Sequence, residues 1–232
     1  MKYVSIDIET TGLDPETCQT IQIGAVIEDT ENLVPINDLP RFKCLVEHPQ
    51  YTGSPFALVM NKDILAQLGE LERANKEERA ELRKKYNILP EGLVAKSLGM
   101  WLQAHGLGDP ESKTGQVRIT VAGKNFATFD KLFLQKLTGW SSSIQIRQRM
   151  IDPAILCMDW ANDKGLPNLA ECMKRAGVEG EVTHDALQDA IDVIRVMRSV
   201  TVDYTKITFW QCKNVQKFGK WCWLAGYSYI LS

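Results

Sequence analysis

The chain has 232 residues, a formal net charge of −2 and 44% hydrophobic residues, which suits one large globular domain, alone or with an appendage. This charge excludes a strong overall attraction to nucleic acid, so any such binding must rest on a local basic patch or on metal ions. The six cysteines form no C-x-x-C pair and no Cys/His cluster, which argues against structural zinc and favours a reducing compartment.

The first predicted element is a strand in the stretch YVSIDIETTGLD, residues 3–14. Side chains alternate along a strand, so three apolar residues share one face and three polar residues share the other: Val4, Ile6 and Ile8 against Ser5, Asp7 and Glu9. Two interpretations fit this pattern, a strand with a solvated face or a carboxylate pair that holds a hard divalent cation. Thr10, Thr11 and Gly12 end the strand, which leaves both carboxylates at its exit, where α/β proteins usually bind ligands.

Two further strands are predicted at 20–29 and 41–49, and three short consecutive strands indicate a meander. From Asn61 to about Tyr86 the pattern predicts one densely charged helix with a sparse apolar face. Its mixed charges indicate a solvated surface, and we assign it no chemistry. Residues 92–105 have helical periodicity, and residues 116–125 are typical of a buried strand.

A short helix is predicted from about Phe129 to Leu137, with Asp130 in its first turn, where the helix dipole favours an aspartate. Further helices are predicted at 166–178 and 184–200. Strands followed by helices mixed with strands indicate an α/β protein with a mixed sheet flanked by helices.

The stretch THDALQDA, residues 183–190, carries His184 and Asp189. Inside one helix, five residues at 100° each would point these side chains about 140° apart. If the helix instead begins near Asp185, His184 lies in the preceding loop and both side chains can face one pocket. Asp185, four residues before Asp189, is a rival for the same helix face.

The tail from Tyr204 onward interleaves lysines with aromatic residues and contains no Asp or Glu. We therefore predict an extension over residues 203–232 that makes no contribution to chemistry, next to a main domain at 1–202. Lysines and stacking aromatics suit contact with single strands or with a partner protein, while packing of the aromatics onto the domain or in a dimer contact is the alternative.

Taken together, Asp7, Glu9, Asp130, His184 and Asp189 resemble the site residues of the DEDD-type 3′–5′ exonucleases, in the histidine (DEDDh, DnaQ-like) subtype of the RNase H-like superfamily. DIETTGL resembles that family's first motif, NFATFD its second and HDALQDA its third, and the resemblance covers about residues 3–200. In many members an asparagine precedes the second-motif aspartate by four positions, whereas Asn125 precedes Asp130 by five.

This resemblance implies an RNase H-like fold and a two-metal-ion 3′–5′ exonuclease that releases nucleoside monophosphates from single-stranded DNA or RNA. It implies that Asp7 bridges two Mg²⁺ ions (or Mn²⁺), that Glu9 and Asp189 hold the ion carrying the attacking water, and that Asp130 helps to hold the second. His184 is the implied general base. Contacts to the terminal nucleotide are implied for five further residues: Thr10, Thr11, Gly12, Leu13 and Asn125.

Two alternatives stay open at the level of sequence. One is an RNase H-like endonuclease, and the other is a partner-dependent proofreading or 3′-end-binding subunit that acts with a polymerase or another replication or processing partner. The sequence has no apolar run of membrane-spanning length and no secretory-type amino terminus, so we predict a cytoplasmic protein without a membrane partner. No motif decides between DNA and RNA, or the oligomeric state.

Overall fold

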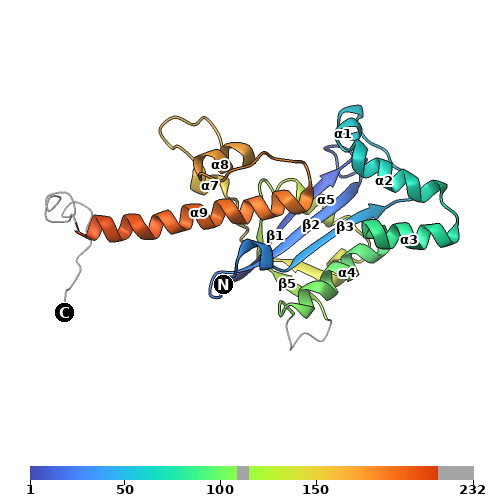
Figure 1. Cartoon of the computed structure of the whole chain (residues 1–232), viewed down its shortest axis with the longest axis horizontal. Coiled ribbons are helices and arrows are strands. Elements are labelled where there is room, and N and C mark those ends of the chain that lie inside the picture. The colour runs from blue at the N-terminus through green and yellow to red at the C-terminus, as the bar shows by residue number, and fades with distance from the viewer. Residues whose placement is uncertain (109–114, 214–232) are drawn as a thin grey trace.

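The structure is a computed structural model that describes residues 1–108 and 115–213, with side chains as far as residue 201 (Figure 1). Its strands are β1 (Lys2–Thr10), β2 (Thr20–Asp29), β3 (Arg41–Glu47), β4 (Ile88–Pro90), β5 (Val117–Ile119), β6 (Val121–Ala122) and β7 (Ile144–Ile146). Its helices are α1 (Pro55–Met60), α2 (Lys62–Arg73), α3 (Lys76–Tyr86), α4 (Glu91–Ala104), α5 (Asp130–Leu134), α6 (Trp140–Ser143), α7 (Ala154–Cys157), α8 (Leu169–Arg175) and α9 (Ala186–Lys213), with a 3₁₀ turn at Ile36–Asp38.

The main sheet has five strands in the order β4-β3-β2-β1-β6. The first three strands pair antiparallel with their sequence neighbours, which confirms the predicted meander. β6 pairs parallel with β1 and β4 pairs parallel with β3, so the sheet is mixed, as predicted. β5 and β7 form a separate two-stranded parallel sheet.

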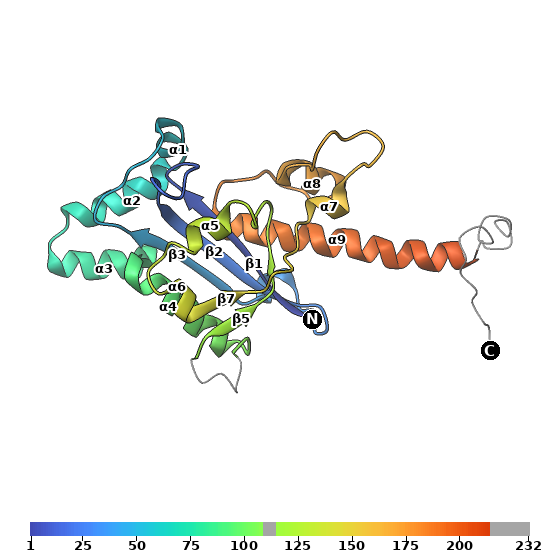
Figure 2. The ribbon, with the colours of Figure 1, turned by 180° about the vertical axis from the view of Figure 1, so that it is seen from behind.

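Both faces of β1 are covered. Val4, Ile6 and Ile8 pack in a core with α4, α5 and α6, the helices that Figure 2 shows on that side of the sheet. Tyr3, on the opposite face, packs in a second core with residues of α9, which lies across β1 and β2. The solvated face that was one of the two interpretations of β1 is therefore absent, and the polar residues of this strand lie under a helix.

Two predicted elements are each divided in the structure. The single helix expected from Asn61 to Tyr86 is two helices, because Asn75 begins α3 with a capping box that it shares with Glu78. α2 also buries apolar residues (Ile64, Leu68 and Leu71), so its apolar face is larger than expected, whereas α3 buries none. The strand expected at 116–125 divides into β5 and β6, which join different sheets.

Helix α9 was expected to end near residue 200 but continues to Lys213, and its second half runs on past the edge of the sheet (Figure 1). The predicted domain boundary at residue 202 falls inside this helix. Residues 214–232, which carry most of the lysine- and aromatic-rich tail, lie outside the described residues, so the prediction for the tail stays a prediction. Among the described helices, none combines the length and the apolar character that a membrane crossing requires.

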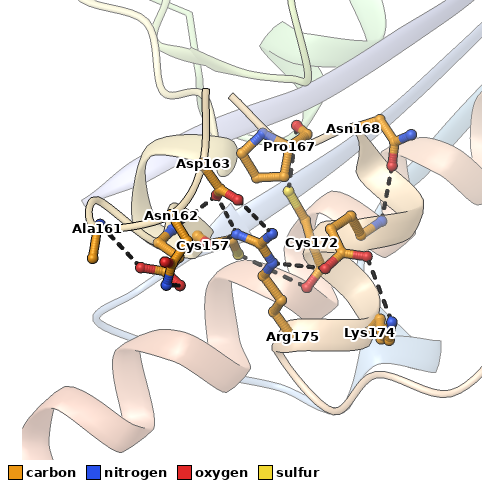
Figure 3. A network of polar contacts seen from close by, with 11 residues as sticks. Cys157, Ala161, Asn162, Asp163, Pro167, Asn168, Cys172, Lys174 and Arg175 are labelled. Carbon is orange, nitrogen blue, oxygen red and sulfur yellow. Dashed lines mark hydrogen bonds and ion pairs between the residues drawn. The ribbon is translucent and has the colours of Figure 1, made fainter. Parts of the chain in front are cut away.

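An arm formed by α7, α8 and the loop between them packs beside α9 (Figure 3). Arg175 holds this loop to α8, because its guanidinium pairs with Asp163 and Glu171 and donates to the carbonyl of Cys157. Asn168 caps α8 by accepting a hydrogen bond from the backbone N–H of Glu171 at 2.9 Å. The loop that leads from this arm to α9 is thus anchored at its start.

A nearly buried ion pair fastens α9 to β2. Arg198 Nε donates to Glu28 Oε2 at 2.6 Å, and Nη1 donates to the carbonyl of Val34 at 2.8 Å. The Glu28 side chain is only 1% exposed, so removing the guanidinium would leave a buried carboxylate without its counter-charge.

We expect Arg198→Met to lower the free energy of unfolding by about 3–5 kcal/mol, the usual effect of breaking a buried pair from one side. The measurement is urea unfolding, with Arg118→Met on the exposed side of β5 as the matched control. Adding Glu28→Met to Arg198→Met is expected to recover much of the loss. Equal destabilisation by the two arginine variants would contradict this account.

Candidate active site

The end of β1 is shaped by a register irregularity between Glu9 and Thr10. Up to that point Glu9 pairs with Gln22, and beyond it Thr10 pairs with Thr20. Bulges of this kind re-aim side chains and occur often beside active sites. Asp7 is half-buried and Glu9 is buried, and both lie on the side of the sheet that α9 covers.

The loop after β1 is tied to the segment before α1. Thr11 Oγ1 donates to the carbonyl of Thr52 at 2.6 Å, and the backbone N–H of Ser54 donates to the carbonyl of Thr11 at 2.9 Å. A Cβ at Gly53 would stand 2.0 Å from that Thr11 oxygen, so only glycine permits this close approach. The loop therefore has a fixed shape.

This fixed loop places the residues expected to contact a terminal nucleotide. Thr10 and Thr11 are buried and use their hydroxyls in internal hydrogen bonds, and Gly12 is also buried. Leu13 is 83% exposed and is the member of the set that projects outward. The four residues are together in space, but their side chains do not offer equal access to a ligand.

Asp130 reaches the same edge because β6 runs parallel to β1, so the carboxyl ends of the two strands meet there. Its Oδ1 accepts a hydrogen bond from the backbone N–H of Ile8 at 3.2 Å, between the two carboxylates of β1. A cavity of about 460 Å³ opens at this point, lined by Asp7, Ile8, Leu13, Lys124, Asn125, Thr128, Phe129 and Asp130. Asn125 lies in this wall in a left-handed conformation (φ 56°) and is exposed.

His184 and Asp189 adopt the second of the two geometries considered for their spacing. α9 begins at Ala186, so His184 precedes the helix, with a left-handed φ of 53°, and Asp189 projects from within it. Asp185 accepts hydrogen bonds from the backbone N–H groups of Leu187 and Gln188, each at 3.2 Å, and thus caps α9. Its second oxygen pairs with Lys43.

The first turn of α9 rests directly on β2. Gln22 Oε1 accepts a hydrogen bond from the backbone N–H of Ala186 at 2.7 Å. A Cβ at Gly24 would come within 2.2 Å of the backbone of Ala186 and Leu187, so the helix can lie this close only over a glycine. These contacts fix the height of Asp189 above the sheet.

One oxygen of Glu9, one oxygen of Asp189 and one ring nitrogen of His184 all lie within 4.8 Å of one another. Asp7 belongs to the same cluster, because the negative charges of Asp130, Asp189 and Glu9 all raise its pKa. The structure thus brings together all five residues that resemble the exonuclease set, from β1, α5 and the start of α9.

Electrostatics make this cluster unfavourable without a counter-ion. Burial, followed by the charges of the neighbouring carboxylates, raises the pKa of Asp7 well above its ordinary value. Burial and the nearby charge of Asp189 raise the pKa of Glu9 to about 8, against a hydrogen bond from Asn61 that lowers it. Burial raises the pKa of Asp130 and, to about 6, that of Asp189, whereas His184 opposes the shift at Asp189.

The donor set fits hard divalent cations. Four carboxylates converge, and every charged neighbour that shifts the pKa of Asp7 is another acid. Asp189 Oδ1 is buried without a hydrogen-bond partner among the described residues, a position that costs free energy unless a ligand completes it. Divalent cations bound to these oxygens would remove both the repulsion among the carboxylates and the cost of the unpaired Asp189 oxygen.

Four residues of the site have no signal in the sequence that we recognised. Asn61 Nδ2 donates to the carbonyl of Thr10 at 3.1 Å and bonds Glu9, so it orients the first-motif acid from the start of α2. Gln22 and Gly24 seat α9, and Lys43 pairs with its cap. The one readable cue was Gly24 inside an otherwise apolar strand, which indicates close backbone approach.

The raised pKa values predict a pH-dependent stability in the absence of divalent metal. A carboxyl whose pKa is higher in the folded than in the unfolded state binds its proton more tightly when folded, so stability is lost as pH rises. The ordinary pKa is 3.8 for Asp and 4.5 for Glu, and the pKa of Glu9 in the folded protein is about 8, so the loss is expected between about pH 4.5 and 8. Urea midpoints in EDTA should fall across this range.

Two comparisons make this pH test specific to the cluster. Mg²⁺ binds the ionised carboxylates, so its stabilising effect is expected to grow with pH and to cancel most of the loss. Asp7→Asn should flatten the profile in EDTA, because one member of the cluster can no longer ionise. A wild-type profile in EDTA that rises between about pH 4.5 and 8 would refute the repulsive cluster.

No protein-family model matches the chain, and no curated protein matches it in sequence. Among solved structures, exonuclease I of E. coli in complex with a 5cy-dT13 oligonucleotide superimposes with a TM-score of 0.54 at 18% identity, over 91% of this chain. A full-length 3′-exonuclease gives 0.56 at 15% identity over 87% of the chain. The chain has the RNase H-like fold.

Cell-death related nuclease 4 (CRN-4) shares this fold, with a TM-score of 0.54, 13% identity and 88% of the chain covered. The chain spans 43% of the length of exonuclease I, 60% of the 3′-exonuclease and 64% of CRN-4. These RNase H-like neighbours bear out the predicted fold. At such low identity, the activity of the chain must be argued from its own site.

Proposed function

We propose that the chain is a two-metal-ion 3′–5′ exonuclease that acts on single-stranded nucleic acid. The observation that carries the proposal is the convergence of Asp7, Glu9, Asp130 and Asp189, with His184 beside them, at one edge of an RNase H-like sheet. Exonuclease and nuclease neighbours with the same fold support it, including exonuclease I bound to single-stranded DNA.

Asp7, Glu9, Asp130 and Asp189 would hold the divalent cations, for which Mg²⁺ is the best match to an all-carboxylate set. When bound, such cations neutralise charge on the scissile phosphate, activate a water and stabilise the leaving oxygen. Asn61 and Gln22 serve the site by position: Asn61 orients Glu9, and Gln22 fixes the start of the helix that carries Asp189.

His184 is the proposed general base. Its ring lies next to Glu9 and Asp189 and is exposed, so an attacking water has access to it. A ring nitrogen of neutral imidazole accepts the proton of the water, and the imidazolium that forms lies beside two acids that stabilise it. This role requires His184 to be neutral at the start of the reaction.

Leu13 and α1 form an exposed apolar surface at the loop after β1. Leu13 is 83% exposed, and Phe56 and Val59 on α1 are 77% and 70% exposed. The contacts of Thr11 with Thr52 and Ser54 join α1 to this loop. We infer that the terminal base packs on this surface, whereas Thr10 and Thr11 maintain the shape of the loop. Apolar contact with the face of a base is possible for all four bases, so it does not select a nucleotide sequence.

The test uses single-stranded DNA and RNA oligonucleotides labelled at either end, with Mg²⁺, Mn²⁺ or EDTA. Release of mononucleotides from the 3′ end only, abolished by EDTA, is the expected result, and the DNA-to-RNA ratio gives the substrate preference. Release from the 5′ end, or activity in EDTA, would refute the proposal.

Two controls address the alternatives. Cleavage of a closed single-stranded circle would identify an RNase H-like endonuclease. Inactivity of the purified chain, reversed by addition of a polymerase or another replication partner, would identify a partner-dependent subunit. We expect neither outcome, because an endonuclease has less use for the third motif and because one ligand atom each of Glu9, His184 and Asp189 already lies within 4.8 Å of the others in the isolated chain.

A further inference from the structure

The cavity beside Asp7 and Asp130 has a basic residue in its wall. Lys124 lines it together with Asn125 and Thr128, and the Lys124 side chain is only 13% exposed. A lysine side chain is seldom buried to this degree unless its charge is paired with an acid or a ligand. The four carboxylates of the proposed metal site leave this lysine unused, since its ammonium pairs with Asp152 instead.

The ammonium of Lys124 is held in place by Asn125 and Asp152. It donates to Asn125 Oδ1 at 2.6 Å and lies 3.7 Å from Asp152 Oδ2. Asp152 is itself fixed, because its oxygens accept hydrogen bonds from the backbone N–H groups of Asn125 (3.1 Å) and Ala154 (2.9 Å). An ammonium has three N–H donors, so these two contacts leave one for an acceptor in the cavity.

The geometry of a 3′ end determines which acceptor this is. The bond hydrolysed by a 3′–5′ exonuclease is the last phosphodiester of the strand, so no further phosphodiester lies on its 3′ side. Any second phosphate near the carboxylates therefore belongs to the 5′ side. Cations bound to the carboxylates would neutralise the scissile phosphate and would leave the charge of that second phosphate to be neutralised by a basic side chain, for which lysine is common.

We propose that Lys124 forms a phosphate subsite, in which its ammonium binds the non-bridging oxygens of the phosphodiester one step 5′ of the scissile one. This inference rests on the proposed function. Asp152 is a positioning residue for the subsite, and Asn125 supports the ammonium through its side-chain oxygen. The subsite makes the protein sensitive to the length of the shortest substrates.

The test compares a dinucleoside monophosphate, which has only the scissile phosphate, with a trinucleotide, which has one more. Lys124→Met is expected to raise KM for the trinucleotide roughly 10-fold, the scale of one charge-assisted hydrogen bond, and to leave the dinucleotide unaffected. The dependence of binding on salt should lose about one unit of slope, and Lys124→Arg should retain most of the affinity.

A second measurement separates a lost contact from a disturbed fold. Replacing the 5′-side phosphodiester of the trinucleotide by a neutral methylphosphonate should weaken binding to the wild type by the same factor. It should not weaken binding to Lys124→Met further, as a double-mutant cycle requires. Additive losses from the two changes would overturn the subsite.

The matched control is Lys85→Met, because Lys85 lines a different cavity of about 600 Å³ that includes His184. It is expected to bind both substrates like the wild type. A length-dependent loss in Lys85→Met in place of Lys124→Met would overturn the proposal and direct the strand through the His184 cavity.

Binding is measured at equilibrium with oligonucleotides that carry a 3′-terminal phosphorothioate, which slows hydrolysis. Separate measurements of binding and cleavage distinguish a failure of the phosphate subsite from a failure of the proposed nuclease function. Length-dependent binding through Lys124 without any cleavage would refute the nuclease and leave the subsite standing. Cleavage that is indifferent to Lys124 would refute the subsite alone.

Discussion

Asp189→Asn is expected to lower exonuclease turnover by roughly 10³-fold or more, the scale on which removal of a principal catalytic group acts. Asn has the same size and can occupy the same place in α9, so the fold has no reason to change. What is lost is a negative oxygen that lies within 4.8 Å of Glu9 and His184. Turnover on a 3′-labelled oligonucleotide at saturating Mg²⁺ measures the effect.

The same variant is expected to be more stable than the wild type when metal is absent. Asp189 raises the pKa of both Asp7 and Glu9, so its removal relieves repulsion in a buried cluster. The thermal midpoint in EDTA should therefore rise while the stabilisation by Mg²⁺ shrinks. Loss of activity together with gain of metal-free stability distinguishes a ligand from a residue that maintains the fold.

Asp185→Asn is the matched control for this experiment. Asp185 caps α9 through the backbone N–H groups of Leu187 and Gln188, and an asparagine can make the same contacts. The variant loses the pairing with Lys43 and a negative charge that raises the pKa of Asp7, Glu9 and Asp189. We expect turnover within about tenfold of the wild type, and the opposite ranking of Asp185→Asn and Asp189→Asn would invalidate the assignment of the metal-binding acid.

His184→Asn is expected to lower turnover by about 10²–10⁴-fold, the usual contribution of a general base. Asparagine is chosen because His184 has a φ of 53°, a left-handed conformation that asparagine tolerates better than alanine. Single-turnover rates on a 3′-labelled oligonucleotide at saturating Mg²⁺ measure the effect.

Metal binding decides between two roles for His184, since its ring nitrogen lies close enough to Glu9 and Asp189 to share an ion with them. If His184 acts as the general base, replacing it is expected to leave the affinity for Mn²⁺, measured by calorimetry, nearly unchanged. A large fall in Mn²⁺ affinity, with activity restored at high Mn²⁺, would identify His184 as a ligand.

The positions of the residues in the first and third motifs could be predicted because they depend on local strand and helix periodicity. Alternation placed Asp7 and Glu9 on one face of β1, and the helix period showed that His184 and Asp189 would diverge unless His184 preceded the helix. Both statements depend on local chain geometry, which the sequence determines within a few residues. The mixed sheet followed from the order of strands and helices.

The contacts that orient these residues could not be predicted from local periodicity. Gln22 bonds the backbone of Ala186 across 164 residues, and Asn61 bonds the backbone of Thr10 across 51. A polar side chain that binds a distant backbone group leaves no periodicity in the sequence. The division of the strand at 116–125 has the same origin, because β5 and β6 pair with different distant partners.

The break between α2 and α3 was accessible and was missed. Asn75 followed by Glu78 is a capping-box pattern, and it outweighed the continuous run of helix-favouring charged residues around it. Helix α9 is longer than expected for the opposite reason: the predicted extension starts at residue 203, whereas the backbone continues as helix to Lys213.

The seating of α9 on β2 has a consequence for how the protein is made. Chains are synthesised from the N-terminus, and the acids of β1 and α5 emerge long before the helix that carries Asp189. On the proposed function, a nascent chain that has formed much of the sheet still lacks Asp189 and His184, two of the residues that hydrolysis would need. Hydrolysis would then begin only after α9 has been translated and has docked.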